Sequence, residues 1–286
     1  RGSRRDRVGR LGLGRRPGQL LGAGLVAGAG AWALLEPARL KVRHLDVPLE
    51  RWPPALDGLR VAVLSDLHTG APHVDERKLA RIVAKLNAQR PDLVALVGDY
   101  ADPSVPLGEP VAPEAVAEEL GALRAPLGVF AVLGNHDWYH YGERVPRALR
   151  AAGIEVLEND AVAVEHHGEV LWIAGLADMR ERDADATVAL AMVPPQQALI
   201  ALTHDPDMFP SLRDRADVTL AGHTHGGQIG IPLLRRAAAP SSGGYIGGEV
   251  REGGGYMYVS RGVGTTGLPI RFAAPPEMAV LTLRSR

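Results

Sequence analysis

Five short apolar runs, each followed at once by a polar cluster, constrain the fold of this chain most. The runs cover residues 59–64, 93–97, 129–133, 198–202 and 218–221. Apolar runs of about four to eight residues bounded by turn-forming residues are typical of buried strands. Between the first two runs, Asp75 can cap a helix whose apolar face would be Leu79, Ile82, Val83 and Leu86. Alternating strands and helices favour a largely parallel sheet with both faces covered.

The polar clusters supply side chains that bind transition metals. Ligands bind beyond the carboxyl ends of parallel strands, so we expect the five clusters to meet at one edge. The candidate ligands are two carboxylates, one amide and four imidazoles: Asp66, His68, Asp99, Asn135, His204, His223 and His225. Because this set exceeds one tetrahedral site, it predicts two divalent metal ions. Nitrogen and oxygen ligands in a chain without cysteine favour manganese, iron or zinc over calcium. Two carboxylates neutralise only part of the charge of two divalent ions, and the remaining positive charge favours a phosphate-like ligand.

Each cluster also has an ordinary structural explanation. An Asp-x-His pair such as Asp66/His68 arises by chance, and a Gly-Asp step such as 98–99 is common turn chemistry. His204 alone is compatible with a hydrogen-bonded histidine at a strand end. Metal binding is favoured because all five clusters follow predicted strands. The histidines outside this pattern are expected at the surface: His44, His73, His140, His166 and His167.

The order of the motifs resembles the calcineurin-like metallophosphoesterase superfamily. The motifs are Asp66-x-His68, Gly98-Asp99-x-x-Asp102, Gly134-Asn135-His136-Asp137, His204 and Gly222-His223-x-His225. Segments 222–228, 260–264 and 268–272 are similar to its bacterial YkuE/YaeI-type branch. The resemblance runs from about Leu59 to the C-terminus. It implies an α/β fold, a four-layer αββα sandwich with the metals at the strand ends.

The resemblance also implies a role for each motif residue. The ligands would form two triads and a bridging carboxylate: Asp66, His68 and His225; Asn135, His204 and His223; and Asp99. A metal-bridging hydroxide would attack phosphorus, with His136 as the general acid and Asp102 orienting it. A histidine suits the acid role because it titrates near neutral pH.

One departure from the superfamily pattern narrows the class of enzyme. Protein Ser/Thr phosphatases of the superfamily carry an arginine just after the second Asp, whereas Pro103 follows Asp102 here. Glu follows their Asn-His pair, whereas this chain has Asp137. Protein phosphatase activity is therefore disfavoured. Arg261 and Arg271 are the candidate contacts for a substrate phosphate, although either could be a structural arginine.

The N-terminal part predicts export or membrane association. Seven arginines in residues 1–16 precede an uncharged stretch, 18–35, that contains five glycines and five alanines. A basic region followed by a weakly apolar core is typical of an export signal or signal anchor, and a disordered basic leader is the alternative. The predicted organisation is a basic leader with a signal or anchor segment at 1–36, a linker at 37–57, and the metallophosphoesterase domain at 58–286.

Partners and substrates are less constrained by the sequence. The net charge of −1 does not favour nucleic-acid binding, and no protein partner is predicted. Membrane-associated members of the superfamily hydrolyse UDP-2,3-diacylglucosamine, so the preferred substrate is a similar lipid-linked pyrophosphate. The alternatives are a general phosphodiesterase or phosphomonoesterase for small exported phosphates, and an inactive metal-stabilised binding module at the membrane. Segment 232–255, rich in Gly, Ala, Ser and Pro, is expected to form a flap that selects substrates.

Overall fold

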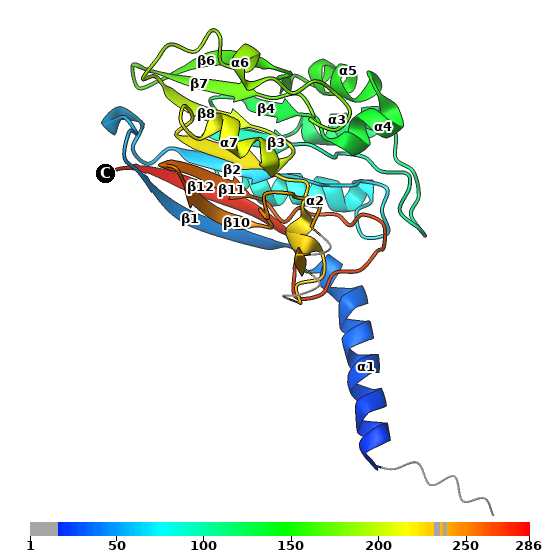
Figure 1. Ribbon diagram of the computed structural model, residues 1–286. Coiled ribbons are helices and arrows are strands. Elements are labelled where there is room, and N and C mark those ends of the chain that lie inside the picture. The colour runs from blue at the N-terminus through cyan, green and yellow to red at the C-terminus, as the bar shows by residue number, and fades with distance from the viewer. Residues whose placement is uncertain (1–16, 232–234, 237–238) are drawn as a thin grey trace, which may run out of the picture.

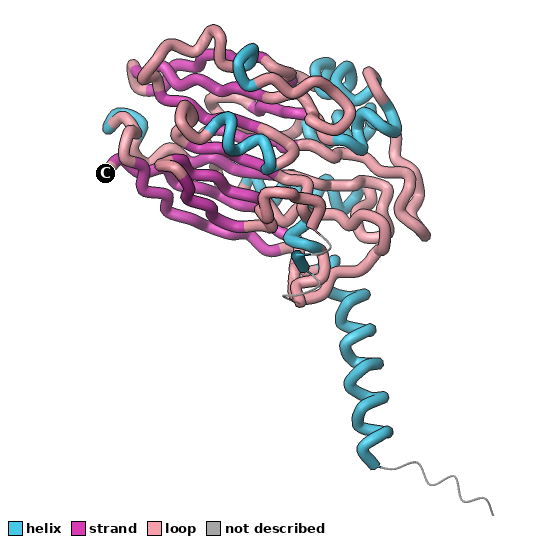
Figure 2. Tube along the Cα trace, viewed as in Figure 1, coloured by secondary structure: helices cyan, strands magenta, loops and turns pink. Residues whose placement is uncertain are grey.

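Two six-stranded β-sheets pack face to face and carry helices on their outer faces (Figures 1 and 2). The computed structural model describes residues 17–231, 235–236 and 239–286, with side chains described from residue 25 onward. The layers follow the order helix, sheet, sheet, helix. The predicted αββα sandwich is therefore confirmed.

The first sheet is mostly parallel and holds three of the predicted strands. Its order is β1 (Lys41–Leu49), β12 (Glu277–Ser285), β2 (Arg60–Leu64), β3 (Leu93–Val97), β4 (Val129–Val132) and β5 (Glu155–Val156). Every neighbouring pair is parallel except β12 with β2. The carboxyl ends of β2, β3 and β4 therefore lie at the same edge.

The second sheet is mixed and holds the other two predicted strands. Its order is β10 (Gly248–Glu252), β11 (Gly255–Val259), β9 (Val218–Ala221), β8 (Ala198–Leu202), β7 (Glu169–Gly175) and β6 (Asp160–His166). The four inner strands are parallel to their inner neighbours, and the two edge strands are antiparallel.

Helices cover the outer face of each sheet. Those against the first sheet are α2 (Glu76–Asn87), α3 (Pro113–Leu120), α4 (Asn135–Tyr141) and α5 (Arg144–Ala151). The second sheet is covered by α6 (Ala186–Ala189) and α7 (Phe209–Leu212). Short 3-10 turns are η1 (Glu36–Ala38), η2 (Pro54–Leu56), η3 (Pro206–Met208) and η4 (His225–Gly227). The predicted cap of α2 is confirmed, because the Asp75 carboxylate accepts from the Lys78 N–H at 2.7 Å.

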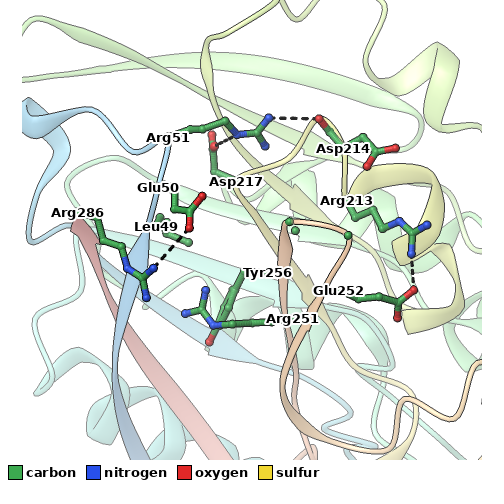
Figure 3. A pocket seen from close by; sticks show the side chains of 13 residues that line it. Leu49, Glu50, Arg51, Arg213, Asp214, Asp217, Arg251, Glu252, Tyr256 and Arg286 are labelled. Atoms are coloured by element: carbon green, nitrogen blue, oxygen red, sulfur yellow. Dashed lines mark hydrogen bonds and ion pairs between the residues drawn. The ribbon is translucent and has the colours of Figure 1, made fainter.

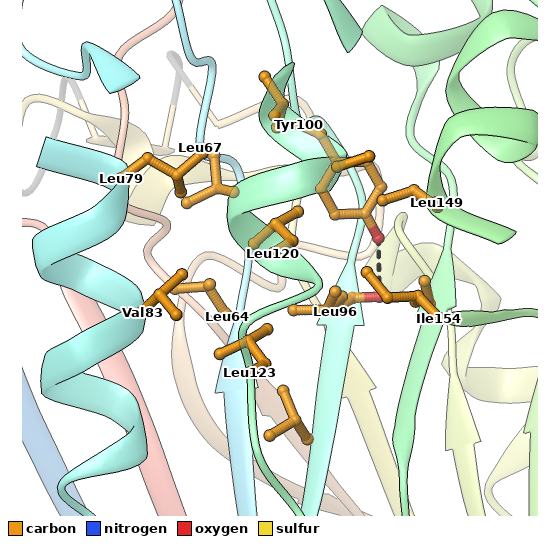
Figure 4. Close-up of a cluster of buried hydrophobic side chains, with 14 of the residues drawn as sticks. Leu64, Leu67, Leu79, Val83, Leu96, Tyr100, Leu120, Leu123, Leu149 and Ile154 are labelled. Carbon is orange, nitrogen blue, oxygen red and sulfur yellow. Dashed lines mark hydrogen bonds between the residues drawn. The ribbon is translucent and has the colours of Figure 1, made fainter. Parts of the chain in front are cut away.

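Side chains alternate between two apolar layers along the strands of the first sheet. In β2, Ala62 and Leu64 face the helices, whereas Val61 and Val63 face the other sheet. The layer under the helices includes the fully buried Tyr100, whose hydroxyl donates to a carbonyl of β3 (Figure 4). This period-two pattern fixes which side chains of each strand face each apolar layer. It therefore also fixes the position of the polar loop that follows the strand.

The predicted linker at 37–57 is wrong. It contains η1, η2 and the nine-residue strand β1, which pairs along its whole length with β12. Charged residues and Pro48 occur in β1 because it is an edge strand with one unpaired side.

Two other expectations fall partly outside the described residues. Of the predicted flap, residues 232–234 and 237–238 are not described, and the remainder includes β10 rather than loop alone. The basic leader at 1–16 is likewise not described. Helix α1 (Pro17–Leu35) projects from the sandwich (Figure 1). Among the described helices, none is both long enough and apolar enough to cross a bilayer.

The environment of Lys78 on α2 predicts an alkaline rise in stability. Burial, together with Arg271 and Arg81, lowers the pKa of Lys78 from 10.5 to about 8. The folded state therefore disfavours the charged amine. This lowers the free energy of unfolding by its full amount below pH 8, and the penalty disappears as the pH rises towards 10.5. We expect Lys78→Met to raise the free energy of unfolding at pH 7 by on the order of 2 kcal/mol and to abolish the alkaline rise.

Urea unfolding from pH 7 to 10 measures both effects. Lys85→Met is the matched control, because Lys85 is also on α2 and also donates to a carbonyl, that of Leu40, but its side chain is exposed. Equal responses of the two variants would contradict a specific cost at Lys78.

Candidate metal centre

The loops after five strands bring the predicted ligands to one edge of the sandwich. Asp66 and His68 follow β2, Asp99 follows β3, and Asn135 opens α4 after β4. From the second sheet, His204 follows β8, while His223 and His225 follow β9. The predicted ligands thus come from both sheets, and the centre lies at the edge of the sandwich between the strand ends of the two sheets.

The ligand atoms form two clusters joined by one carboxylate. In the first cluster, His225 Nε2 lies 3.0 Å from His68 Nε2 and 3.5 Å from Asp66 Oδ1. In the second, His204 Nε2 lies 3.1 Å from His223 Nδ1 and 3.3 Å from Asp99 Oδ2. The same Asp99 oxygen is 3.6 Å from His68 Nε2, so it lies between the clusters. This geometry parallels the grouping that the resemblance implies.

The donor set fits divalent cations. His204 Nδ1 lies 2.8 Å from the carbonyl oxygen of Val97, so the neutral imidazole that keeps this hydrogen bond carries its proton on Nδ1 and leaves the Nε2 lone pair to a cation beside Asp99. His68 Nδ1, 3.0 Å from Asp102, leaves its Nε2 in the same state. Asn135 Oδ1 is buried without a hydrogen-bond partner among the described residues. In these neutral forms the facing lone pairs repel unless a cation lies between them. Without a metal ion, burial lowers the pKa of His204 but Asp99 outweighs burial and raises this pKa well above its ordinary value, so a metal ion would take the place of a proton.

The backbone around the ligands is strained. Five of the seven predicted ligands are non-glycine residues with φ between 43° and 70°: Asp66, His68, Asp99, His223 and His225. Such conformations cost on the order of 1–3 kcal/mol each and accumulate at functional sites. Close approach adds a second demand, since a Cβ at Gly222 would meet Ser65 Oγ at 2.2 Å and Asp66 Oδ2 at 2.8 Å. These loop conformations therefore bring the predicted ligand atoms close together and lower the local stability.

Burial and neighbouring charges set the protonation of the ligands. Burial opposes ionisation of Asp99, but His204 and His68 hold the pKa of its carboxyl well below the usual range. Burial, helped by His204, lowers the pKa of His223 to about 2. Both groups are therefore in the deprotonated form that binds metal. Burial raises the pKa of Asp66, so this ligand gains most from a nearby cation.

Asp102 connects the first cluster to the predicted general acid. Its Oδ2 lies 3.0 Å from Nδ1 of both His68 and His136. Its Oδ1 lies 3.3 Å from His140 Nε2 and accepts from Ser104. Burial lowers the pKa of His136, but Asp102 and Asp99 together raise it more, so the pKa of this imidazole lies above its ordinary value. The expectation that His140 is an unengaged surface residue is wrong.

The two predicted substrate arginines lie behind the centre. Arg271 has no exposed surface, and its guanidinium donates to the carbonyls of Gly264, Arg261 and Ala274. This burial is incompatible with direct substrate contact and corrects that expectation. Its Nη2 lies 3.3 Å from His225 Nδ1, which gives Arg271 a positioning role instead. Arg261 is mostly buried near Glu277, with its Nε 3.9 Å from the carboxylate.

A different arginine faces the metal centre. A cavity of about 410 Å³ opens over the ligands and is lined by Asp99, Asn135, His136, His223, His225 and Arg180, among others. Arg180 follows β7, and its Nε lies 3.0 Å from Asp205 Oδ2. Sequence reasoning missed it, although run 169–175 followed by Asp178 has the same form as the five recognised motifs.

A second cavity lies at the opposite ends of the strands (Figure 3). It measures about 500 Å³, and three of its arginines pair with acids there: Arg51 with Asp217, Arg213 with Glu252, and Arg286 with Glu50. This cavity contains none of the predicted site residues.

Comparisons with known proteins agree with the fold and the motifs. The family model for calcineurin-like phosphoesterases matches residues 59–227, and the chain belongs to this family. It is 32% identical to an uncharacterized metallophosphoesterase, YkuE, of Bacillus subtilis over 94% of both chains. It is 34% identical to a protein of Danio rerio named as a transmembrane protein with a metallophosphoesterase domain, over 85% of this chain and 57% of that one.

A solved NAD nucleotidase of Haemophilus influenzae aligns with 72% of this chain and 50% of its own at a TM-score of 0.46 and 17% identity, which says nothing about this chain's substrate. As a family member, the chain is a hydrolase that acts on phosphoester bonds and has candidate sites for its metals.

The position of Asp99 predicts that one substitution weakens both clusters. Manganese added to chelator-treated protein should raise the melting temperature by roughly 5–10 °C at about a hundredfold excess over Kd. Asp99→Asn should remove most of this rise, because the amide loses the shared negative oxygen. Differential scanning calorimetry with and without manganese measures the shift.

Asp217→Asn is the matched control, because this largely buried carboxylate lies at the opposite end of β9. It should lower the melting temperature but keep the manganese-induced rise. A full rise in Asp99→Asn would exclude a shared role for that carboxylate.

Proposed function

We propose that the chain is a dinuclear phosphoester hydrolase in which Asp99 is shared by two metal ions. The observation that carries the proposal is the Asp99 oxygen between the two ligand clusters. Asp66, His68 and His225 would hold one ion, and Asn135, His204 and His223 the other. Two such ions, of manganese, iron or zinc, would polarise a phosphoryl group and activate water.

The residues over the centre have complementary tasks in this proposal. Asp102 holds Nδ1 of His136, so that Nε2 is the nitrogen left to donate a proton to the leaving oxygen. The backbone N–H of His136 donates to Asp99 Oδ1 at 2.9 Å, which fixes the proposed acid next to the ligand cluster. Arg180 supplies the positive charge that the sequence assigned to Arg261 and Arg271, and it would bind a non-bridging phosphate oxygen.

A lipid-linked pyrophosphate similar to UDP-2,3-diacylglucosamine is the proposed substrate, at a membrane-associated or exported location. Thr266 lines the cavity, and two residues later Leu268 is exposed. An apolar side chain at the rim suits a substrate with acyl chains. The second candidate is a general phosphodiesterase or phosphomonoesterase, supported by the carboxylate, imidazole and guanidinium groups that line the cavity.

Turnover assays separate these functions. Manganese-loaded protein would be assayed with bis(p-nitrophenyl) phosphate and with a panel of UDP-glycolipids. Turnover of the glycolipids at far higher kcat/KM supports the lipid-linked substrate, whereas comparable values support the general activity. No turnover of either class by fully loaded protein would favour an inactive binding module.

The acid role of His136 predicts a dependence on the leaving group. His136→Gln should keep its metals and slow a phenyl phosphodiester by about 100-fold, while a p-nitrophenyl ester, whose leaving group needs little protonation, is slowed much less. Steady-state kinetics with elemental analysis of bound metal tests this. His166→Gln, in β6, serves as the control. Equal slowing of both esters would contradict the acid role.

The position of Arg180 predicts an effect on substrate affinity. Arg180→Gln should raise KM about tenfold or more, because a charge-assisted contact to phosphate is lost. Arg182→Gln is the matched control, since this nearby arginine pairs with Glu158 outside the cavity. An unchanged KM in Arg180→Gln, with a raised KM in Arg261→Gln, would return the role to Arg261.

A further inference from the structure

A cationic cavity lies beside the junction of α1 with the sandwich. It measures about 540 Å³, and its walls come from the segment after η1, the turn before α2, and α2 itself. Four cationic side chains line it against a single acid, Asp75, whose carboxylate is engaged as the cap of α2. The cations are Arg39, Lys78, Arg81 and Lys85.

These cations lack acidic partners within the described part of the chain. None of the four forms an ion pair there, in contrast to the paired arginines of the cavity in Figure 3. Lys78 and Lys85 instead donate to the carbonyls of Pro37 and Leu40. Burial lowers the pKa of Lys78 most, and Arg271 and Arg81 lower it further. Four cations against one engaged acid give the cavity a preference for an anion.

Exposed apolar side chains adjoin the cavity. The C-terminal half of α1 exposes large apolar residues, with Trp32 at 42% and Leu35 at 62%: Leu25, Val26, Trp32, Leu34 and Leu35. The Arg39 guanidinium, from the cavity wall, lies 4.7 Å from the centre of the Trp32 ring. Cationic groups next to tryptophan and leucine are typical of surfaces that enter the headgroup region of a bilayer.

One loop forms a wall between this cavity and the metal centre. Gln228, which lines the catalytic cavity, donates to the carbonyls of Thr266 and Leu268. His73, which lines the cationic cavity, lies 3.0 Å from the carbonyl oxygen of Pro269. A surface that covers the cationic cavity would therefore also lie next to the mouth of the metal centre.

We propose that the cationic cavity and the exposed apolar side chains of α1 together bind the surface of an anionic phospholipid bilayer, with a lipid phosphate in the cavity. The partner is a bilayer because only a surface offers phosphates and an apolar layer side by side. This second anion site is distinct from the metal centre, and its occupancy does not depend on hydrolysis.

Vesicle binding tests the proposal on the full chain. Binding would be measured by cosedimentation with phosphatidylcholine vesicles that contain either no phosphatidylglycerol or about one third of it. We expect Arg81→Gln/Lys85→Gln, both exposed, to weaken binding to the anionic vesicles by on the order of 30-fold. Binding to pure phosphatidylcholine should be unchanged, because the exposed apolar side chains of α1 are intact.

The control removes the same charge elsewhere. Arg124 and Arg147 are exposed near the other edge of the helical layer, and Arg124→Gln/Arg147→Gln should keep nearly wild-type binding to the anionic vesicles. Equal weakening by both pairs would overturn the proposal, as would no weakening by either. Inorganic phosphate that binds wild type but not Arg81→Gln/Lys85→Gln, without any preference for anionic vesicles, would also overturn it. Turnover of a soluble ester by the cavity variant should remain, which separates this test from that of the proposed function.

Discussion

The apolar layer between the two sheets is the constraint on which the metal centre depends. Ligands from the first sheet meet ligands from the second only if the carboxyl ends of both sets of strands come to the same place. Val97 in β3 and Leu220 in β9 pack in that layer one or two residues before their polar loops begin. Two hydrogen bonds then cross between the sheets, from His204 to the Val97 carbonyl and from the His223 N–H to Asp66. The apolar packing thus sets the distances that the chemistry uses.

The stability of this layer is offset at the edge where the ligands gather. Left-handed conformations at five ligands, buried carboxylates and facing imidazole lone pairs all disfavour the folded state. A chain tolerates them only where the surrounding strands hold the loops in place and where a cation can relieve the repulsion. The Asp137 carboxylate holds these loops in place by accepting hydrogen bonds from the backbone N–H groups of Asp99, Tyr100 and Gly134. Burial and the nearby Asp99 raise its pKa to about 7. Local rules of conformation are therefore broken at the candidate metal centre, as is typical of functional sites.

The sequence predicted the strands that carry the candidate ligands well, because buried parallel strands have a strong signature. Strands 93–97, 198–202 and 218–221 have the predicted bounds, and the ligands follow them directly. The edge strand β1 was missed because half-exposed residues and Pro48 hide its pattern. Arg271 was misjudged for another reason. Its partners are carbonyls in loops brought together by the fold, and no local pattern distinguishes a buried arginine from an exposed one.

The metal centre and the cationic cavity have opposite electrostatic needs and share a wall. At the centre, lone pairs and carboxylates face one another and favour cations. In the cavity, unpaired lysine and arginine side chains favour an anion. Arg271 stands between them, close enough to lower the pKa of Lys78 and in contact with His225. Its guanidinium donates to the carbonyls of Gly264, Arg261 and Ala274 and so joins the loops between the two sites. The fold keeps both sites at one end of the molecule, so a bilayer whose phosphates bind in the cationic cavity would lie next to the mouth of the metal centre.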